Sequence, residues 1–312
     1  MRILRLFLSR VGQLLLVLLA VTLVVFILTQ VAPGDPARLR LGPRASQQAV
    51  DALRHQLGLD QSLPMQYVNY VLRVFRGDLG VSVDGQQVTT MVAQRLADTA
   101  WLVTGTVVAS VLSAVALAWL AAMFRDRLLD HSLRLAMLLV LFLPSFWVGF
   151  LLIRLVAIPT GWFPVAGLGE SPQELLPALV LPSITGAIAL APVLVRSLRS
   201  SLVDVLDSEY VAVARSLGIS GPALAARHVM RNAVGPVITL LALNVGYLMF
   251  GVVVLEATFD VPGLGSALVL ASAKQDVYVV QGITLIFAIG VVVSTFLGET
   301  AVALLDPKAA QS

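Results

Sequence analysis

A charged segment in the second half of the chain reads Asp207-Ser208-Glu209-Tyr210-Val211-Ala212-Val213-Ala214-Arg215-Ser216-Leu217-Gly218 and lies between two long apolar runs. Asp207 or Ser208 is suited to cap a helix, and Glu209 in its first turn and Arg215 in its last complement the helix dipole. Gly218 readily adopts the left-handed conformation that ends a helix. The segment therefore predicts a short helix, whose place in the molecule depends on the apolar runs around it.

Composition places the chain in a membrane. Of its 312 residues, 58% are hydrophobic and only 12% are charged, and the mean hydropathy is +0.91. Soluble domains carry about 25% charged residues. The net charge is +3, but the arginines lie near the ends of apolar runs and form no basic stripe, so we expect no nucleic-acid partner. The chain has no cysteine and three scattered histidines, so we expect no disulfide and no metal site.

Six apolar runs are long enough to cross about 30 Å of hydrocarbon as helices. They cover residues 11–31, 99–123, 135–158, 176–195, 233–255 and 279–305. Arginine-bearing segments lie before the first run and after the second and fourth, and short segments of this kind favour the cytoplasmic side. The first run exceeds the apolar core of about 7–15 residues in a cleaved signal peptide, so we keep it as a permanent helix. We predict an all-α integral membrane protein with six transmembrane helices and both termini in the cytoplasm.

The segment between the first two runs is polar and rich in proline. Helical spacing of apolar residues over 45–57 and 64–75 predicts two or three short helices there. Loops longer than about 60 residues escape the positive-inside rule, so we place this segment outside. The expected division is a terminal helix over 1–31, an external helical subdomain over 32–98, and a core of helices 2–6 over 99–312 with a cytoplasmic loop over 196–232. The fourth run contains Pro177, Pro182 and Pro192, which favour kinks.

One side of the short cytoplasmic helix is expected to be apolar. Tyr210, Val213, Ala214 and Leu217 recur at i, i+3, i+4 and i+7, which gives a face about 15 Å long. A helix lying on the inner leaflet is one interpretation, and a helix inserted into a groove of a partner protein is the other. The face is narrow, contains alanine and lacks Trp and Phe, which favours the partner.

A second helix is expected to open at Ser220 and Pro222 and to lead into the fifth apolar run. Its polar positions are Arg227, His228, Arg231 and Asn232. If this helix continues into the membrane, motion received at Tyr210 and Leu217 has a rigid route into the fifth span.

Motifs along almost the whole chain carry a family resemblance. In the cytoplasmic segment they are Glu209-Tyr210-Val211, Ala214-Arg215, Gly218, Arg227-His228 and Asn232-Ala233. Elsewhere they are Pro33-Gly34-Asp35-Pro36, Leu57-Gly58-Leu59-Asp60, Gly77-Asp78-Leu79-Gly80, Pro262-Gly263-Leu264-Gly265 and Asp306-Pro307-Lys308. Together they resemble the B-type subunit of dipeptide/oligopeptide permeases, among the inner-membrane permeases of ABC importers. Met230 in place of the family's Leu and Asp260 in place of its common Ser are departures.

The resemblance implies that the short helix docks on a cytoplasmic ATPase and transmits its closure to the membrane spans. The residues that it assigns to this coupling are Glu209, Tyr210, Val211, Ala212, Ala214, Arg215, Gly218, Arg227, His228 and Asn232. It also implies a heterodimer with a second homologous permease subunit, two ATP-binding subunits and an extracytoplasmic substrate-binding protein, in the inner membrane of a prokaryote. The expected cargo is di- and oligopeptides, with nickel, haem and glutathione as alternatives.

The sequence adds one independent observation about ATP. A phosphate-binding P-loop needs Gly-x-x-x-x-Gly-Lys followed by Ser or Thr, but the only lysines, Lys274 and Lys308, precede Gln275 and Ala309. We therefore expect ATP and Mg²⁺ in partner subunits and no cofactor on this chain. Hydrolase and metalloprotease motifs are also missing, so we expect no enzyme.

An ion-coupled secondary transporter is the main alternative, and it needs ionisable residues deep in the spans. Arg154, Glu256 and Glu299 lie toward span ends instead. Candidate residues for a translocation path or gate are Asn244, Tyr247, Glu256 and Arg154, although isolated polar residues more often join helices. Candidate residues of the external loop are Phe259, Pro262, Gly263 and Gly265. Glu256 beside this loop is interpreted either as part of a gate or binding-protein seat, or as a solvated carboxylate at a rigid turn.

Overall fold

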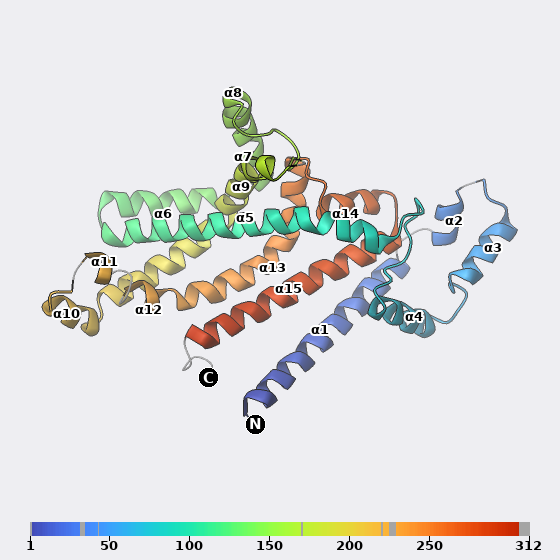
Figure 1. The fold of residues 1–312 in the computed structure, drawn as a ribbon, viewed down its shortest axis with the longest axis horizontal. Coiled ribbons are helices and arrows are strands. Elements are labelled where there is room, and N and C mark those ends of the chain that lie inside the picture. The colour runs from blue at the N-terminus through green and yellow to red at the C-terminus, as the bar shows by residue number, and fades with distance from the viewer. Residues whose placement is uncertain are drawn as a thin grey trace. The chain divides into compact units, whose positions relative to one another are not determined.

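The computed structural model describes residues 2–31, 35–42, 44–169, 171–219, 221–224 and 229–305 (Figure 1). Across these residues the regular structure is helical, apart from one isolated antiparallel bridge between Val81 and Gln87. The predicted all-α class is therefore confirmed. Four of the described helices are long and apolar enough to cross a membrane, and a bent helix pair makes a fifth candidate. Six spans with both termini inside stay a prediction.

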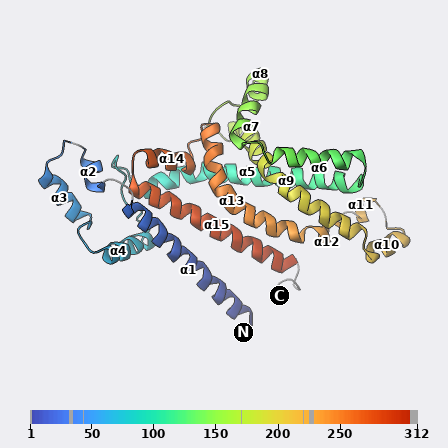
Figure 2. The same cartoon turned by 180° about the vertical axis from the view of Figure 1, so that it is seen from behind.

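The chain divides into two compact units, and the first contains residues 1–99 and 262–292. Its helices are α1 (Arg2–Val31), α2 (Pro36–Leu41), α3 (Gln47–Gln56), α4 (Leu63–Phe75), the start of α5 (Val88–Met123), α14 (Leu264–Ala273) and the start of α15 (Val277–Leu305). Figures 1 and 2 both show α4 beside α1. A hydrogen bond of 3.0 Å between the Thr22 and Tyr67 hydroxyls and the rings of Phe26 and Tyr70, 6.2 Å apart, join these two helices.

Local signals explain the three short helices of this unit. Asp35 caps α2 by accepting from the Ala37 amide at 3.1 Å, and Ser46 caps α3 by accepting from the Ala49 amide at 3.3 Å. Proline occupies the first turn of α2 and of α4, where its missing amide hydrogen costs nothing. The helices expected over 45–57 and 64–75 are confirmed as α3 and α4, with α2 as the third.

The sequence did not predict α14. With ten residues this helix is too short to span a membrane. Its residues are mostly small and apolar, so no polar face marks it as an amphipathic helix. The loop after α14 is joined to the segment before α5 by Asp276, whose carboxylate accepts from the Ser82 hydroxyl at 2.6 Å and from the Val83 amide at 2.9 Å. Asp276 and Ser82 are both buried, so this contact belongs to the core of the first unit.

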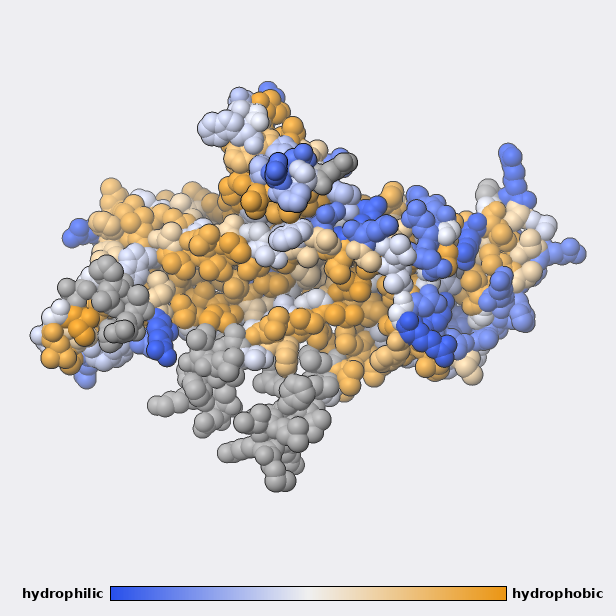
Figure 3. Space-filling view, viewed as in Figure 1, coloured by the Kyte–Doolittle hydropathy of each residue, from blue (hydrophilic) through white to orange (hydrophobic). Residues whose placement is uncertain are grey.

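The second unit contains residues 100–261 and 293–312. Its helices are the remainder of α5, α6 (Leu128–Val140), α7 (Ser145–Leu152), the π-helix η1 (Ile153–Ala157), α8 (Ile158–Thr160), α9 (Pro172–Leu206), α10 (Glu209–Ser216), α11 (Gly221–Leu224), α12 (Arg231–Ala233), α13 (Gly235–Thr258) and the end of α15. α9 packs against α6, α7, α12 and α13 and is the most buried of the candidate spans. Within this unit, Figure 3 shows hydrophobic residues over the surface of α5, α6 and α13.

Two expected spans differ from the structure. The run over 135–158 is broken, because α6 and the helical stretch Ser145–Thr160 meet at 107°. Pro144 lies at the break, where it disfavours helical backbone in the residue before it. The run expected over 99–123 begins at Val88, so α5 extends beyond its apolar part into a segment that contains Arg95 and Asp98. α9, by contrast, stays one continuous helix through Pro177, Pro182 and Pro192.

Candidate functional site

α10 begins and ends close to where the sequence places it. Ser208 is its N-cap residue, Glu209 lies in the first turn and Arg215 in the last. The Ser208 hydroxyl does not cap the helix, however, because it donates to the Val205 carbonyl at 2.5 Å. At the other end, Gly218 has φ of +80°, and the amides of Gly218 and Ile219 donate to the carbonyls of Arg215 and Ala214, both at 3.0 Å. This paired arrangement is the Schellman motif, which requires a left-handed residue at Gly218.

The predicted apolar face of α10 divides into two parts. Val211 and Ala214 are buried in a core with the C-terminal part of α9, including Leu198 and Leu202. Tyr210, Val213 and Leu217 remain 45%, 56% and 74% exposed. We call these three residues the α10 apolar triplet. Since Val211, and not Tyr210, packs inward with Ala214, α10 is fixed to α9 by one side and presents the triplet on another.

The described part of the segment after α10 bends where it enters α13. The described residues of this segment form α11, α12 and then α13, with a bend at Val234 before Gly235 and Pro236. Arg227 and His228 lie outside the described residues. Asn232 on α12 donates to the Tyr210 hydroxyl at 3.1 Å, and Val229 and Ala233 are buried in the same core as Val211. Contacts of its side chains thus join the second half of the segment to α10.

A buried ion pair between α6 and α9 was not predicted from the sequence. Asp130 on α6 is fully buried and accepts two hydrogen bonds from Arg199 of α9, at 2.7 Å to Oδ1 and 2.5 Å to Oδ2. Arg134 lies 3.3 Å from the same carboxylate, and the Asp126 amide donates to it at 3.1 Å. In the sequence Asp130 belongs to a short charged loop, where a solvated carboxylate is the ordinary expectation. Its burial depends on α9, which is distant in the chain.

An exposed ion pair joins the loop after α5 to the residue before α10's N-cap. Arg125 donates to Asp207 at 2.6 Å. This hydrogen bond is the main cause that raises the pKa of Arg125 above its usual value. The pair is accessible to solvent, so it contributes little to stability compared with the buried Asp130 pair. Its effect is to tie the start of α10 to a second loop of the same unit.

The candidate path residues do not form a single group. Asn244 and Tyr247 of α13 line a cavity of about 180 Å³ together with Ser145 and Gly186. Asn244 donates to the Leu240 carbonyl of its own helix at 2.7 Å, and Tyr247 is 76% exposed. Arg154, exposed on η1, and Glu256, near the end of α13, are not part of the lining of this cavity.

The loop after α13 is folded into packed structure on both sides of the unit boundary. In the second unit Glu256 is fully buried, so its interpretation as a solvated carboxylate is wrong, and Phe259 is also buried. In the first unit Arg95 donates to the Pro262 carbonyl at 3.2 Å. Gly263 is the N-cap residue of α14, and Gly265 is buried within α14. Among the described residues no three His, Asp or Glu side chains are grouped so that they could hold a metal ion.

Comparison with known proteins identifies one family over almost the whole chain. Residues 114–311 match the family model of the binding-protein-dependent transport system inner membrane component, and residues 3–118 match the model of its N-terminal region. The chain is 36% identical over 302 residues to the glutathione transport system permease protein GsiC of Salmonella choleraesuis strain SC-B67, which covers 96% of this chain and 97% of the relative. It is 36% identical over 292 residues to the protein of that name in Escherichia coli strain K12, which covers 93% and 94%.

Proposed function

Because the chain belongs to the family of binding-protein-dependent transport system inner membrane components, a family of ABC-importer permease subunits, we propose that it imports short peptides and that α10 is its mechanical input. Glutathione is a tripeptide and is named in the similar permeases, so it stands beside other di- and oligopeptides as the proposed cargo. No feature of the described residues favours nickel, haem or an ion-coupled carrier.

The observation that carries the proposal is the α10 apolar triplet. Three large side chains, Tyr210, Val213 and Leu217, are exposed on a helix that is fixed to α9 through buried Val211 and Ala214. An amphipathic helix with exposed apolar residues fits a groove in a partner. Force applied to the triplet reaches α9 through Val211 and reaches α12 through the bond from Asn232 to Tyr210. Glu209, Ala212 and Arg215 are exposed around the triplet and complete the docking surface.

The proposed assembly contains this chain, a second homologous permease subunit, two ATP-binding subunits and an extracytoplasmic substrate-binding protein. ATP and Mg²⁺ belong to the ATP-binding subunits. In the inner membrane of a prokaryote, this arrangement requires α10 to face the cytoplasm and α2 to α4 to face the binding protein. Arg227, His228 and Gly218 take part in the proposed coupling segment, and Asn244, Tyr247, Glu256 and Arg154 remain candidates for the path or gate.

The test replaces Leu217, the most exposed residue of the triplet, with Asp in the assembled transporter. A charge in the docking groove is costly to bury, so we expect ATP-dependent uptake of glutathione or of a tripeptide to fall at least about tenfold. Ser216→Asp adds the same charge to the same helix outside the triplet and should transport normally. Uptake by Leu217→Asp equal to that of Ser216→Asp, with ATP-binding subunits still attached, would contradict the proposal.

A second variant tests the end of α10 rather than its surface. Proline has φ near −65°, so Gly218→Pro is incompatible with the left-handed backbone at this position. We expect the variant to insert in the membrane but to lose coupling between ATP hydrolysis and uptake. Reversal of the charges at Glu209 and Arg215 should have the same effect, because both exposed side chains belong to the proposed docking surface. Normal uptake by either correctly assembled variant would contradict the assigned role.

A further inference from the structure

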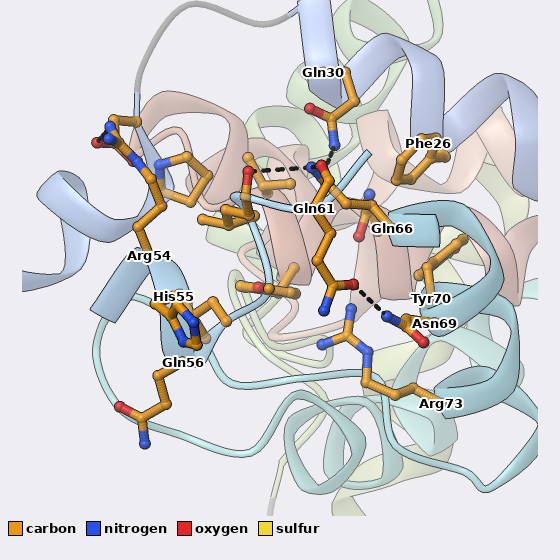
Figure 4. A pocket seen from close by; sticks show the side chains of 18 residues that line it. Phe26, Gln30, Arg54, His55, Gln56, Gln61, Gln66, Asn69, Tyr70 and Arg73 are labelled. Carbon is orange, nitrogen blue, oxygen red and sulfur yellow. Dashed lines mark hydrogen bonds and ion pairs between the residues drawn. The ribbon is translucent and has the colours of Figure 1, made fainter. Parts of the chain in front are cut away.

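A polar cavity of about 540 Å³ lies in the first unit, between the end of α1, the α3–α4 region and the start of α15 (Figure 4). Its size is that of a small-molecule site. Its lining contains an unusual number of amide side chains, namely Gln30, Gln56, Gln61, Gln66, Asn69 and Gln281. The lining of the cavity contains no residue of α10 and none of the candidate path residues.

The amides on one side of the cavity hold each other in place. Gln66 donates to the carbonyls of Leu59 at 3.1 Å and Gln61 at 2.8 Å, and it accepts from the Gln30 amide at 3.1 Å. Asn69 donates to the Gln61 side-chain oxygen at 2.8 Å. Figure 4 shows the bond between Gln30 and Gln66 and the bond between Gln61 and Asn69 among the side chains that line the cavity. A wall of mutually oriented amides is prepared to bind a ligand that has amide groups of its own.

The charges in the lining leave one cation uncompensated. Arg54 is neutralised by Asp35, with 2.6 Å between Nη2 and Oδ2. Arg73 has no carboxylate within 4.0 Å among the described residues, and its guanidinium instead lies 5.5 Å from the centre of the Tyr278 ring. With histidine neutral, the lining therefore carries one net positive charge, and that charge is on Arg73.

Tyr70 adds a second unsatisfied group. Its side chain is buried, and its hydroxyl has no hydrogen-bond partner among the described residues. Burial raises the pKa of Tyr70 to about 12, so the hydroxyl stays protonated. An arginine without a counterion in a polar cavity calls for a ligand that brings acceptor oxygens.

We propose that this cavity binds a short peptide-like molecule, with the ligand carboxylate on Arg73 and the ligand amides against the wall of Gln61, Gln66 and Asn69. Arginine holds a carboxylate through two parallel hydrogen bonds, and the contact of the Arg73 guanidinium with the Tyr278 ring limits its motion. The proposal rests on the cavity alone and stands whether or not α10 couples to an ATPase.

The experiment measures ligand binding to the full chain in detergent, without partner subunits, by isothermal titration calorimetry. The probes are trialanine and trialanine amide, which differ only in the carboxylate. We expect trialanine to bind at least about tenfold more tightly, because a charge-assisted hydrogen bond contributes more than a neutral one. Absence of trialanine binding, or equal affinities for acid and amide, would overturn the proposal and leave the proposed transport function untouched.

Variants test whether Arg73 causes the difference in affinity between trialanine and its amide. Arg73→Gln should lose at least about tenfold in trialanine affinity and no longer distinguish acid from amide. Arg76→Gln is the matched control, because Arg76 is exposed one turn away and outside the lining. Asn69→Asp supplies Arg73 with a carboxylate while keeping its packing on Tyr278, so it should also weaken trialanine binding if Arg73→Gln fails to fold. Affinity of folded Arg73→Gln or Asn69→Asp equal to that of Arg76→Gln would overturn the assignment.

Discussion

At the scale of single residues, burial distinguishes the charges that determine the structure from those that do not. Asp130 and Asp207 both accept hydrogen bonds from arginine, but Asp130 is fully buried and Asp207 is exposed. The sequence gives the two residues similar contexts, each beside a short arginine-bearing segment. Only Asp130 is covered by α9, so the local sequence could not predict which of the two carboxylates is buried.

Removing the buried carboxylate is expected to destabilise the second unit. Asp130→Ala leaves Arg199 without its partner in a mostly buried position, which should lower the free energy of unfolding by about 2–4 kcal/mol. The measurement is thermal unfolding in detergent, followed by tryptophan fluorescence. Asp207→Ala removes the exposed pair and serves as control, with little change expected. Equal unfolding midpoints for the two variants would show that the buried pair does not stabilise this unit.

At Asp260 the backbone conformation matters more than the charge of the side chain. Its φ is +49°, in the left-handed region that Asp tolerates and β-branched residues avoid. Asp260→Val should therefore reduce stability by about 1–2 kcal/mol, and Asp260→Gly should be neutral or slightly stabilising. Thermal unfolding of both variants provides the check. A stable Val variant would mean that the loop after α13 relaxes to another conformation.

At the scale of elements, the sequence predicted what depends on neighbours in the chain and missed what depends on neighbours in space. The bounds of α10 follow from Glu209, Arg215 and Gly218, which act locally. The inward packing of Val211 could not be foreseen, because it depends on Leu198 and Leu202 of α9. Similarly, the apolar run predicts a helix over 135–158. The bend of 107° near Pro144 could not be foreseen, because tertiary contacts decide whether a helix continues past a proline or breaks there.

Close packing of α5 on α9 predicts that replacing a helical glycine with alanine lowers the stability of the protein, although alanine normally favours a helix. A Cβ on Gly186 would lie 2.8 Å from the Thr106 hydroxyl and 3.0 Å from the Leu255 side chain, whereas Gly235 has open space. Gly186→Ala should cost about 1–3 kcal/mol through overpacking, while Gly235→Ala should be neutral or stabilising because alanine favours helices. Unfolding midpoints of the two variants give the comparison. A stabilised Gly186→Ala would contradict tight helix contact at this position.

At the scale of the whole molecule, composition predicts the class of protein and motifs predict the family, but neither predicts the cavity in the first unit. Gln66 and Asn69 resemble ordinary polar residues of a surface helix. They become part of a site only because Tyr278 and Gln281, about two hundred positions later in the chain, close the same cavity. No local sequence pattern predicts that residues so far apart in the chain line one cavity, so the site could be found only in the structure.

The predicted topology is open to a direct test because the natural chain contains no cysteine. Single cysteines at Gln86, Trp162 and Ser216 each occupy an exposed position. A membrane-impermeant maleimide should label Gln86→Cys and Trp162→Cys in intact cells, and it should label Ser216→Cys only after the membrane is permeabilised. Labelling of Ser216→Cys in intact cells would place α10 outside and contradict both the orientation and the coupling role.

The contact between Asp276 and Ser82 also limits how early the first unit can be completed during synthesis. The two residues are 194 positions apart, and both are buried. Translation proceeds at about 5–20 residues per second, so Ser82 waits roughly 10–40 s for its acceptor. Throughout that time the segment around Ser82 lacks its permanent neighbour, and the first unit is completed only when synthesis is nearly finished. The N-terminal part of the nascent chain is therefore incompletely packed for most of its synthesis.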